Sequence, residues 1–179
     1  IENSYFMDGT TGTSSYLADF PNGGKVVLKG NMFHKGPNAD NPNAISYGAE
    51  GLSNPSNTFE AVHNTVVITR SGGAFLAIAS GTSSVKLTAN LFAGTGSPAL
   101  ITGGYAAASA VQANNVTSVA SNIPGASNVT TPNFWPNATL QSLIALSVVP
   151  DASYTRDAPA PYALRAISGS RKVGALQSA

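Results

Sequence analysis

The segment Leu28-Lys29-Gly30-Asn31-Met32-Phe33 decides the fold, because variants of it recur along the first 116 residues. Each copy has a small or aliphatic residue, then Asn (Ser in the first copy) three positions on, then Phe or Val two positions later. The other copies are residues 1–6, 61–66, 87–92 and 111–116. In this alignment the Asn position reads Ser4, Asn31, Asn64, Asn90 and Asn114. Spacings of 24 to 33 residues are typical of one turn of a solenoid.

A second set of short apolar segments lies between these copies, at residues 15–19, 44–47, 74–79 and 98–102. Stretches rich in Gly, Pro, Ser and Asn separate the two sets and predict bends and loops. Each coil is therefore expected to contain one strand, a bend, a second strand that carries the Asn, and a loop.

The chemistry of Asn supports stacking of these coils. Equivalent residues in neighbouring coils lie about 4.8 Å apart, and an Asn side chain both donates and accepts hydrogen bonds. Stacked Asn residues can therefore bond along the column, while the Phe and Val positions fill the core. A β-sandwich with chance Asn residues near its strand ends is the alternative, and five copies in phase favour the solenoid.

The composition excludes several other classes of protein. The chain has 179 residues, enough for one domain, and only 9% of them are charged, with a net charge of +1. This leaves no basic stripe for nucleic acid and too few charges for the solvent faces of a helical bundle. No apolar run is long enough to span a membrane, and there is no Cys for a disulfide or a thiolate site. The uncharged polar surface predicts an extracellular or periplasmic location.

Several motifs resemble right-handed parallel β-helix proteins of the pectin-lyase-like superfamily. They are GNMF (residues 30–33), HNTVV (63–67) and ANLF (89–92), and two longer motifs, residues 14–24 and 35–51, look like bacterial exported β-helix-repeat proteins. The resemblance covers residues 1–117. It implies an all-β fold, a single-stranded right-handed parallel β-helix of about four to five coils with an irregular C-terminal tail.

On this interpretation residues 1–117 form the coils, and residues 118–179 form an irregular C-terminal segment that packs on the same domain. Residues 140–145 predict a short helix capped by Asn137 or Thr139. Residues 162–165 and 173–176 resemble the closing segment of the superfamily, which packs along the outside of the coils. Because the first copy begins at residue 1, we expect a fragment of a longer β-helix, or an open first coil that self-association covers.

One candidate site pairs two Tyr-x-x-acid motifs, Tyr16 with Asp19 and Tyr47 with Glu50. They lie 31 residues apart, so adjacent coils could stack the tyrosines and bring Asp19 near Glu50. Two close carboxylates would share a proton or hold Ca²⁺, which makes Asp19 and Glu50 the candidate metal ligands. The alternative is that both carboxylates cap turns.

A second candidate group is cationic and contains His34, Lys35 and Arg70. Cations beside acids are what an acidic sugar would need, with a Lys, Arg, His or Tyr as the base that removes a proton. The candidate catalytic residues are therefore Asp19, His34, Lys35, Tyr47, Glu50 and Arg70. The alternative is that these side chains are solvated bystanders.

Two functions follow as hypotheses. The first is a β-helix that binds or acts on a polysaccharide, as a lyase acting on an acidic (uronate) glycan. The second is a non-catalytic structural or surface β-helix, or a fragment whose active site lies in missing N-terminal coils. An enzyme requires the candidate residues to gather on one face of the solenoid.

Overall fold

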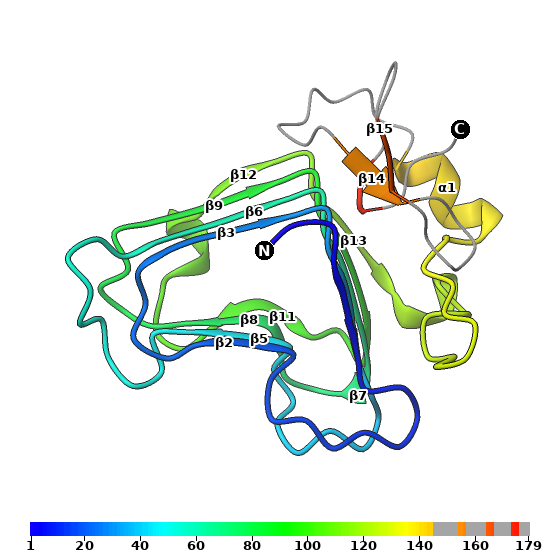
Figure 1. Cartoon of the computed structure of the whole chain (residues 1–179), viewed down its shortest axis with the longest axis horizontal. Coiled ribbons are helices and arrows are strands. Elements are labelled where there is room, and N and C mark those ends of the chain that lie inside the picture. Colours follow the sequence, from blue (N-terminus) through cyan, green and yellow to red (C-terminus); the bar gives the residue numbers. More distant parts are fainter. Residues whose placement is uncertain (145–153, 157–163, 167–172, 176–179) are drawn as a thin grey trace.

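The computed structural model describes residues 1–144, 154–156, 164–166 and 173–175. Its coils are built from three parallel sheets (Figure 1). Sheet A contains β3 (Lys25–Lys29), β6 (Thr58–Val62), β9 (Ser84–Thr88) and β12 (Val111–Ala113). Sheet B contains β1 (Tyr5–Met7), β4 (Met32–Lys35), β7 (Thr65–Ser71), β10 (Leu91–Thr95) and β13 (Val116–Val119). Sheet C contains β2 (Ala18–Phe20), β5 (Ile45–Tyr47), β8 (Ala74–Ile78) and β11 (Ala99–Thr102).

Neighbouring strands in each of these sheets are three places apart along the chain, so the chain is a parallel β-solenoid of about four to five coils. The predicted solenoid is confirmed, but each coil has three strands where two were expected. The reason is that the repeated segment is not one strand. It contains the end of a sheet A strand, a sharp bend, and the start of the next sheet B strand.

The stacked Asn residues at this bend form a continuous hydrogen-bonded ladder. The Oδ1 atom of Asn64 accepts from both the backbone N–H and the side-chain amide of Asn31, each at 3.0 Å. The Oδ1 atom of Asn90 accepts in the same way from Asn64, each at 2.9 Å. The Nδ2 atom of Asn64 also donates to Leu28 O at 2.9 Å. The ladder thus satisfies the backbone N–H groups of Asn31 and Asn64 at the bend between sheets A and B.

The last member of the ladder is Asn115, so the predicted Asn114 is wrong by one position. Asn115 Oδ1 accepts from the backbone and the side chain of Asn90, each at 3.0 Å. Asn114 instead occupies the bend position before the ladder, where the backbone is left-handed in every coil. This position reads Asn3, Gly30, His63, Ala89 and Asn114, with φ between 48° and 63°. Because the ladder residue in this coil is Asn115 and not Asn114, the residue in register with Phe92 is Thr117 and not Val116.

Aromatic and aliphatic side chains from all three sheets fill the interior. Phe6 and Phe33 stack with their ring centroids 5.1 Å apart, as their in-register positions on β1 and β4 predict. Phe75 of sheet C meets Phe92 of sheet B at 5.1 Å across the core. The apolar column predicted from the repeats therefore lies inside the coils at Phe6, Phe33, Val66 and Phe92, but the prediction is wrong for Val116, which packs with the outer cluster on sheet B.

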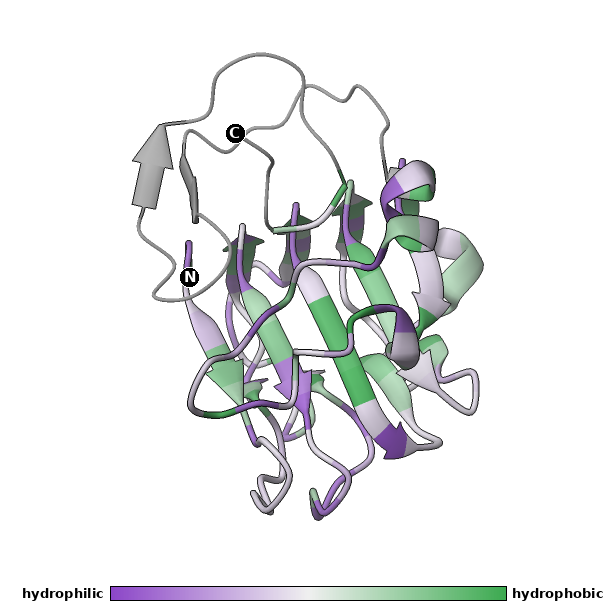
Figure 2. Ribbon diagram, turned by 90° about the vertical axis from the view of Figure 1, so that its right-hand side faces the viewer, coloured by the Kyte–Doolittle hydropathy of each residue, from purple (hydrophilic) through white to green (hydrophobic). Residues whose placement is uncertain are grey.

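A second apolar cluster lies on the outer face of sheet B, where part of the C-terminal region covers the strands (Figure 2). Phe134 and Leu140 pack there against Met32 and Val67. Val173 and Ala175 are buried in the same cluster, and the Ala175 N–H donates to Thr65 Oγ1 at 2.9 Å. The outer face of this sheet is thus a packed interface and not a free surface.

The predicted helix is α1 (Ala138–Ile144), which begins two residues earlier than expected. Of the two predicted caps, Asn137 is correct, because its Oδ1 accepts from the Leu140 N–H at 3.1 Å. Two 3₁₀ turns, η1 (Ala107–Ser109) and η2 (Ala120–Asn122), and an antiparallel pair, β14 (Tyr154–Arg156) with β15 (Leu164–Ala166), complete the described elements. Residues 162, 163 and 176 of the predicted closing segment lie outside the described residues. No helix in the described ranges has the length and apolarity needed to cross a membrane.

Candidate functional site

The structure separates the six predicted site residues into two groups. His34 and Lys35 end β4 of sheet B, and Arg70 lies in β7 of the same sheet, so these three gather where sheet B turns toward sheet C. Asp19 lies in β2, Tyr47 in β5, and Glu50 in the loop after β5. The cations therefore occupy one corner of the coil, while the carboxylates and the tyrosine belong to sheet C.

Lys35 is fully buried, and its ammonium group is enclosed by the loop that precedes β2. Its Nζ donates to Ser14 O at 2.8 Å, to Ser14 Oγ at 2.9 Å and to Ser15 O at 2.7 Å. Asp8 Oδ2 lies 4.0 Å from the same nitrogen. Burial lowers the pKa of Lys35, and the negative charge of Asp8 opposes that shift. With its three donors occupied by this loop, the ammonium is not presented to a ligand.

His34 is also fully buried, and its hydrogen bonds define its tautomer. The Thr69 hydroxyl donates to Lys35 O at 3.0 Å, so its oxygen is left to accept from His34 Nε2, which lies at 3.1 Å. The Nε2 atom therefore carries the proton, and Nδ1 has no hydrogen-bond partner among the described residues. Burial lowers the pKa of His34 to about 4, against the attraction of Asp8, so the ring is neutral near pH 7.

Arg70 is half-buried and fixes the neighbouring loop. Its Nη1 donates to Ala39 O. It therefore holds the connection between β4 and β5, in the same corner where Lys35 holds the connection between β1 and β2.

Tyr47 is a core residue, with 1% of its surface exposed. Its ring meets Phe59 edge-on at 5.6 Å, and its hydroxyl donates to Gly24 O at 2.6 Å. Burial raises the pKa of the Tyr47 hydroxyl. The stacking of Tyr16 on Tyr47 that the sequence suggested is wrong, because Phe20 is the residue in register with Tyr47.

The observed register does not align Asp19 with Glu50, the two carboxylates that the sequence suggested as a pair. Asp19 lies beside Ser46 on β5, and the Glu50 backbone instead lies beside Pro21, to whose oxygen its N–H donates at 2.9 Å. Both carboxylates are exposed. Within the described residues no group of three or more His, Cys, Asp or Glu side chains could hold a metal ion.

A groove of about 310 Å³ lies on the outer face of sheet C. Ile45 and Tyr47 point into the core, so strand alternation turns Ser46 to the outer face. Ser46, Ala77 and Thr102 occupy one register row across β5, β8 and β11, and these small side chains leave the face hollow. Tyr16 and Asn43, from the loops that enter β2 and β5, complete one side of the groove.

Ser46 contributes a hydroxyl to the lining of this groove. Ser46 is fully buried, and its hydroxyl has no hydrogen-bond partner among the described residues. A buried hydroxyl without a partner is unfavourable by roughly 1–3 kcal/mol. Among the described residues that line the groove none is charged, although Asp19 lies beside Ser46 in the same row.

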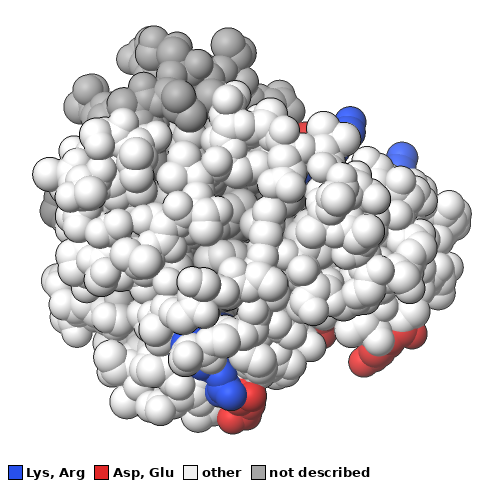
Figure 3. Space-filling model, turned by 180° about the vertical axis from the view of Figure 1, so that it is seen from behind, with Lys and Arg blue, Asp and Glu red and all other residues white. Residues whose placement is uncertain are grey.

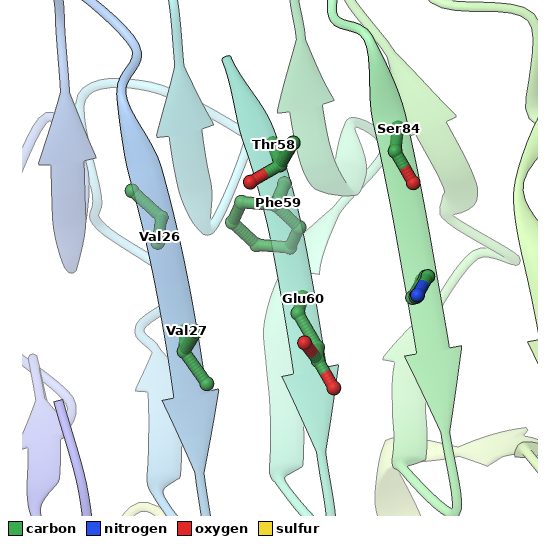
Figure 4. Close-up of a pocket in the computed structure, with 7 residues that line it drawn as sticks. Val26, Val27, Thr58, Phe59, Glu60 and Ser84 are labelled. Atoms are coloured by element: carbon green, nitrogen blue, oxygen red, sulfur yellow. The ribbon is translucent and has the colours of Figure 1, made fainter. Parts of the chain in front are cut away.

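A second hollow, of about 250 Å³, lies on the outer face of sheet A (Figure 4). Val27, Glu60 and Lys86 occupy one row across β3, β6 and β9, and Thr58 and Ser84 stand in the row before it. Its charged residues, Glu60 and Lys86, lie opposite one another on adjacent strands, an arrangement typical of a solvated sheet surface.

Charge is sparse over the surface as a whole. Seen from behind, most of the molecule carries neither sign, and the visible Lys, Arg, Asp and Glu side chains lie toward its margins (Figure 3). A broad electrostatic surface for a polyanion is absent from this view of the described residues. The groove on sheet C agrees with this character, since its lining is hydroxyl, amide, aromatic and small aliphatic.

No family model, no curated protein and no solved structure matches this chain. The pairing of strands in three parallel sheets identifies the chain as a parallel β-solenoid.

The sequence missed the residues that make the groove. Ser46, Ala77 and Thr102 gave no motif, because small residues at outward strand positions are common in any sheet. The available signal was the alternation within residues 45–47, Ile-Ser-Tyr, combined with the correct register to the next coil.

Proposed function

We propose that this solenoid is a glycan-binding protein and that the groove on sheet C receives a sugar of an uncharged glycan. The observation that carries the proposal is the buried Ser46 hydroxyl, which lacks a partner among the described residues and belongs to the lining of a groove that also includes Tyr16, Asn43 and Thr102. A sugar hydroxyl would supply the missing hydrogen bond, and the groove volume falls at the lower end of the range for ligand sites.

The character of the lining supports a neutral glycan over the uronate polymer that the sequence suggested. A uronate carboxylate needs a nearby cation, but Lys35 is buried and donates to Ser14 and Ser15, and the half-buried Arg70 donates to Ala39 O. Asp19, beside Ser46, would repel a carboxylate. Tyr16 and Asn43 offer the combination of an aromatic ring and an amide that suits sugar hydroxyls and ring C–H groups.

The same geometry favours binding over lyase chemistry. A lyase needs a base and a cation together on the substrate, whereas His34 and Lys35 are buried and Tyr47 lies in the core. We therefore propose a non-catalytic binding protein related to the pectin-lyase-like superfamily, located outside the cell or in the periplasm. The motifs quoted from the sequence and the uncharged surface support this relationship and this location.

The test is a binding screen against neutral oligosaccharides of glucose, xylose, mannose and galactose, with pectate, alginate and a glycosaminoglycan in parallel. We expect binding to a neutral member, loss of that binding in Tyr16→Ala, and no change in Thr58→Ala on the opposite sheet. Absence of binding across the panel, or full binding by Tyr16→Ala, would refute the proposal. Unsaturated product absorbance with a uronate polymer would establish a lyase in its place.

A further inference from the structure

Lys35 connects two coils at the corner that leads into the groove. Its side chain leaves β4 in the second coil, and its ammonium donates to Ser14 and Ser15 in the first coil. These two residues immediately precede Tyr16, which lines the groove. One buried charge therefore fixes the peptide groups next to a groove residue.

Other contacts fix the same loop from both sides. Asp8, at its start, accepts from the Gly36 N–H at 2.9 Å and lies 4.0 Å from Lys35 Nζ. Ser14 O accepts a second hydrogen bond, from the Asp40 N–H at 3.2 Å. Gly36 itself has no room for a side chain, since an added Cβ would lie 2.4 Å from Gly9 O. The loop is thus held closely against the second coil.

A fully buried ammonium group is an unusual way to fill this corner. Removing an ion from water is unfavourable, and an apolar side chain of similar volume often packs as well. What an apolar side chain cannot do is direct three donors at Ser14 and Ser15, and this is what Lys35 does. Its distinctive effect is the placement of residues 14–16.

We propose that Lys35 is a positioning residue for Tyr16, which it holds at the edge of the glycan groove through Ser14 and Ser15. Only the glycan ligand in this inference rests on the proposed function. The placement of the loop by Lys35 can be measured without any glycan.

The experiment replaces the ammonium and then restores it chemically. The chain has no Cys, so Lys35→Cys carries a unique thiol. Alkylating this thiol with bromoethylamine in the unfolded protein, followed by refolding, displaces bromide and restores an ammonium group at lysine length. The control is Asn90→Ala, which breaks the Asn ladder between sheets A and B, away from this corner.

Amide hydrogen exchange provides the first readout. We expect Lys35→Cys to speed exchange of the Leu17 and Asp40 amides, which donate to Ala44 O and Ser14 O, by about tenfold more than exchange in sheet A, and we expect aminoethylation to reverse the change. The Asn90→Ala variant should show no selective effect at these two amides. Unaltered exchange at Leu17 and Asp40 in Lys35→Cys, or failure of aminoethylation to restore protection, would overturn the inference whether or not a glycan binds.

Glycan affinity provides the second readout, measured with the neutral oligosaccharide that wild type binds best. We expect about tenfold weaker binding by Lys35→Cys and recovery after aminoethylation. Wild-type affinity in folded Lys35→Cys would also overturn the inference. If wild type binds no member of the panel, the proposed function fails, while the exchange readout still decides the role of Lys35.

Discussion

Asn64 accepts two hydrogen bonds from Asn31 on a single side-chain oxygen, one from the backbone N–H and one from the side-chain amide. The arrangement repeats one coil later between Asn64 and Asn90. Each Asn thus accepts hydrogen bonds from the Asn of the preceding coil, and its own N–H groups donate to the Asn of the next coil. The ladder makes the stability of one coil dependent on its neighbours.

The first prediction concerns this ladder. Asn64→Ala would leave the Asn31 backbone N–H without a partner in a buried bend, and it would leave the Asn31 side-chain amide with Ile1 O as its remaining acceptor. It would also remove a donor from Leu28 O. We expect the free energy of unfolding to fall by about 3 kcal/mol, measured by denaturant titration. Asn54→Ala is the control, because that amide donates to Asn22 O in an exposed loop. Equal losses for the two variants would show that the ladder is not a major source of stability.

The second prediction concerns pH. The pKa of His34 is lowered from 6.5 to about 4 in the folded chain, so between these values the unfolded chain binds a proton that the folded chain does not. His34 therefore destabilises the fold as pH falls from 6.5 to 4, by on the order of 3 kcal/mol. In His34→Gln, which keeps a donor for Thr69, this part of the pH dependence should disappear. A difference between the two stability curves that is constant over this range would contradict the prediction.

The third prediction separates backbone strain from steric overlap at two adjacent glycines. Gly72 and Gly73 both have positive φ, of 78° and 84°. A Cβ at Gly72 would meet nothing within 4 Å, whereas one at Gly73 would lie 2.3 Å from Pro42 O. Gly72→Ala should lower the free energy of unfolding by about 1 kcal/mol, because an alanine is strained in the left-handed backbone conformation. Gly73→Ala should lower it by at least about 2 kcal/mol more, because its Cβ would also overlap with Pro42 O. Thermal unfolding of both variants checks this, and similar melting temperatures would show that the Pro42 loop yields easily.

The fourth prediction concerns Ser46. Replacing it with Ala removes a buried hydroxyl that has no partner, so Ser46→Ala should be as stable as wild type, or up to about 1 kcal/mol more stable. The same change should weaken glycan binding, because a hydrogen-bonding group of the groove lining is lost. Denaturation and calorimetric titration measure the two effects on one sample. A less stable variant with unchanged affinity would mean that the hydroxyl has a structural partner and no ligand role.

Much of the fold could be predicted from the sequence, because the Asn and Phe repeats are direct consequences of stacking. Asn31, Asn64 and Asn90 were placed correctly. The last coil was shifted by one because Asn114 and Asn115 are adjacent, and only the left-handed bend tells them apart. The third strand of each coil was missed because the bend inside the repeat occupies only two residues.

The site was less predictable, for two physical reasons. Loop lengths differ between coils, so an equal spacing of Tyr16 and Tyr47 from their acids did not imply an equal register. The burial of Lys35 depends on Ser14 and Ser15, 20 residues or more away, and no local pattern around Lys35 indicates it. Polar residues that are buried by a neighbouring coil look like surface residues in the sequence.

Binding of an uncharged glycan in the groove on sheet C can be followed by an amide chemical-shift titration of the labelled protein with a mixture of neutral hexose oligosaccharides. We expect shifts at Tyr16, Ser46 and Thr102 that saturate, with sheet A unaffected. Shifts confined to Glu60 and Lys86 on the outer face of sheet A, or no saturable shift at any amide, would refute the proposed glycan site.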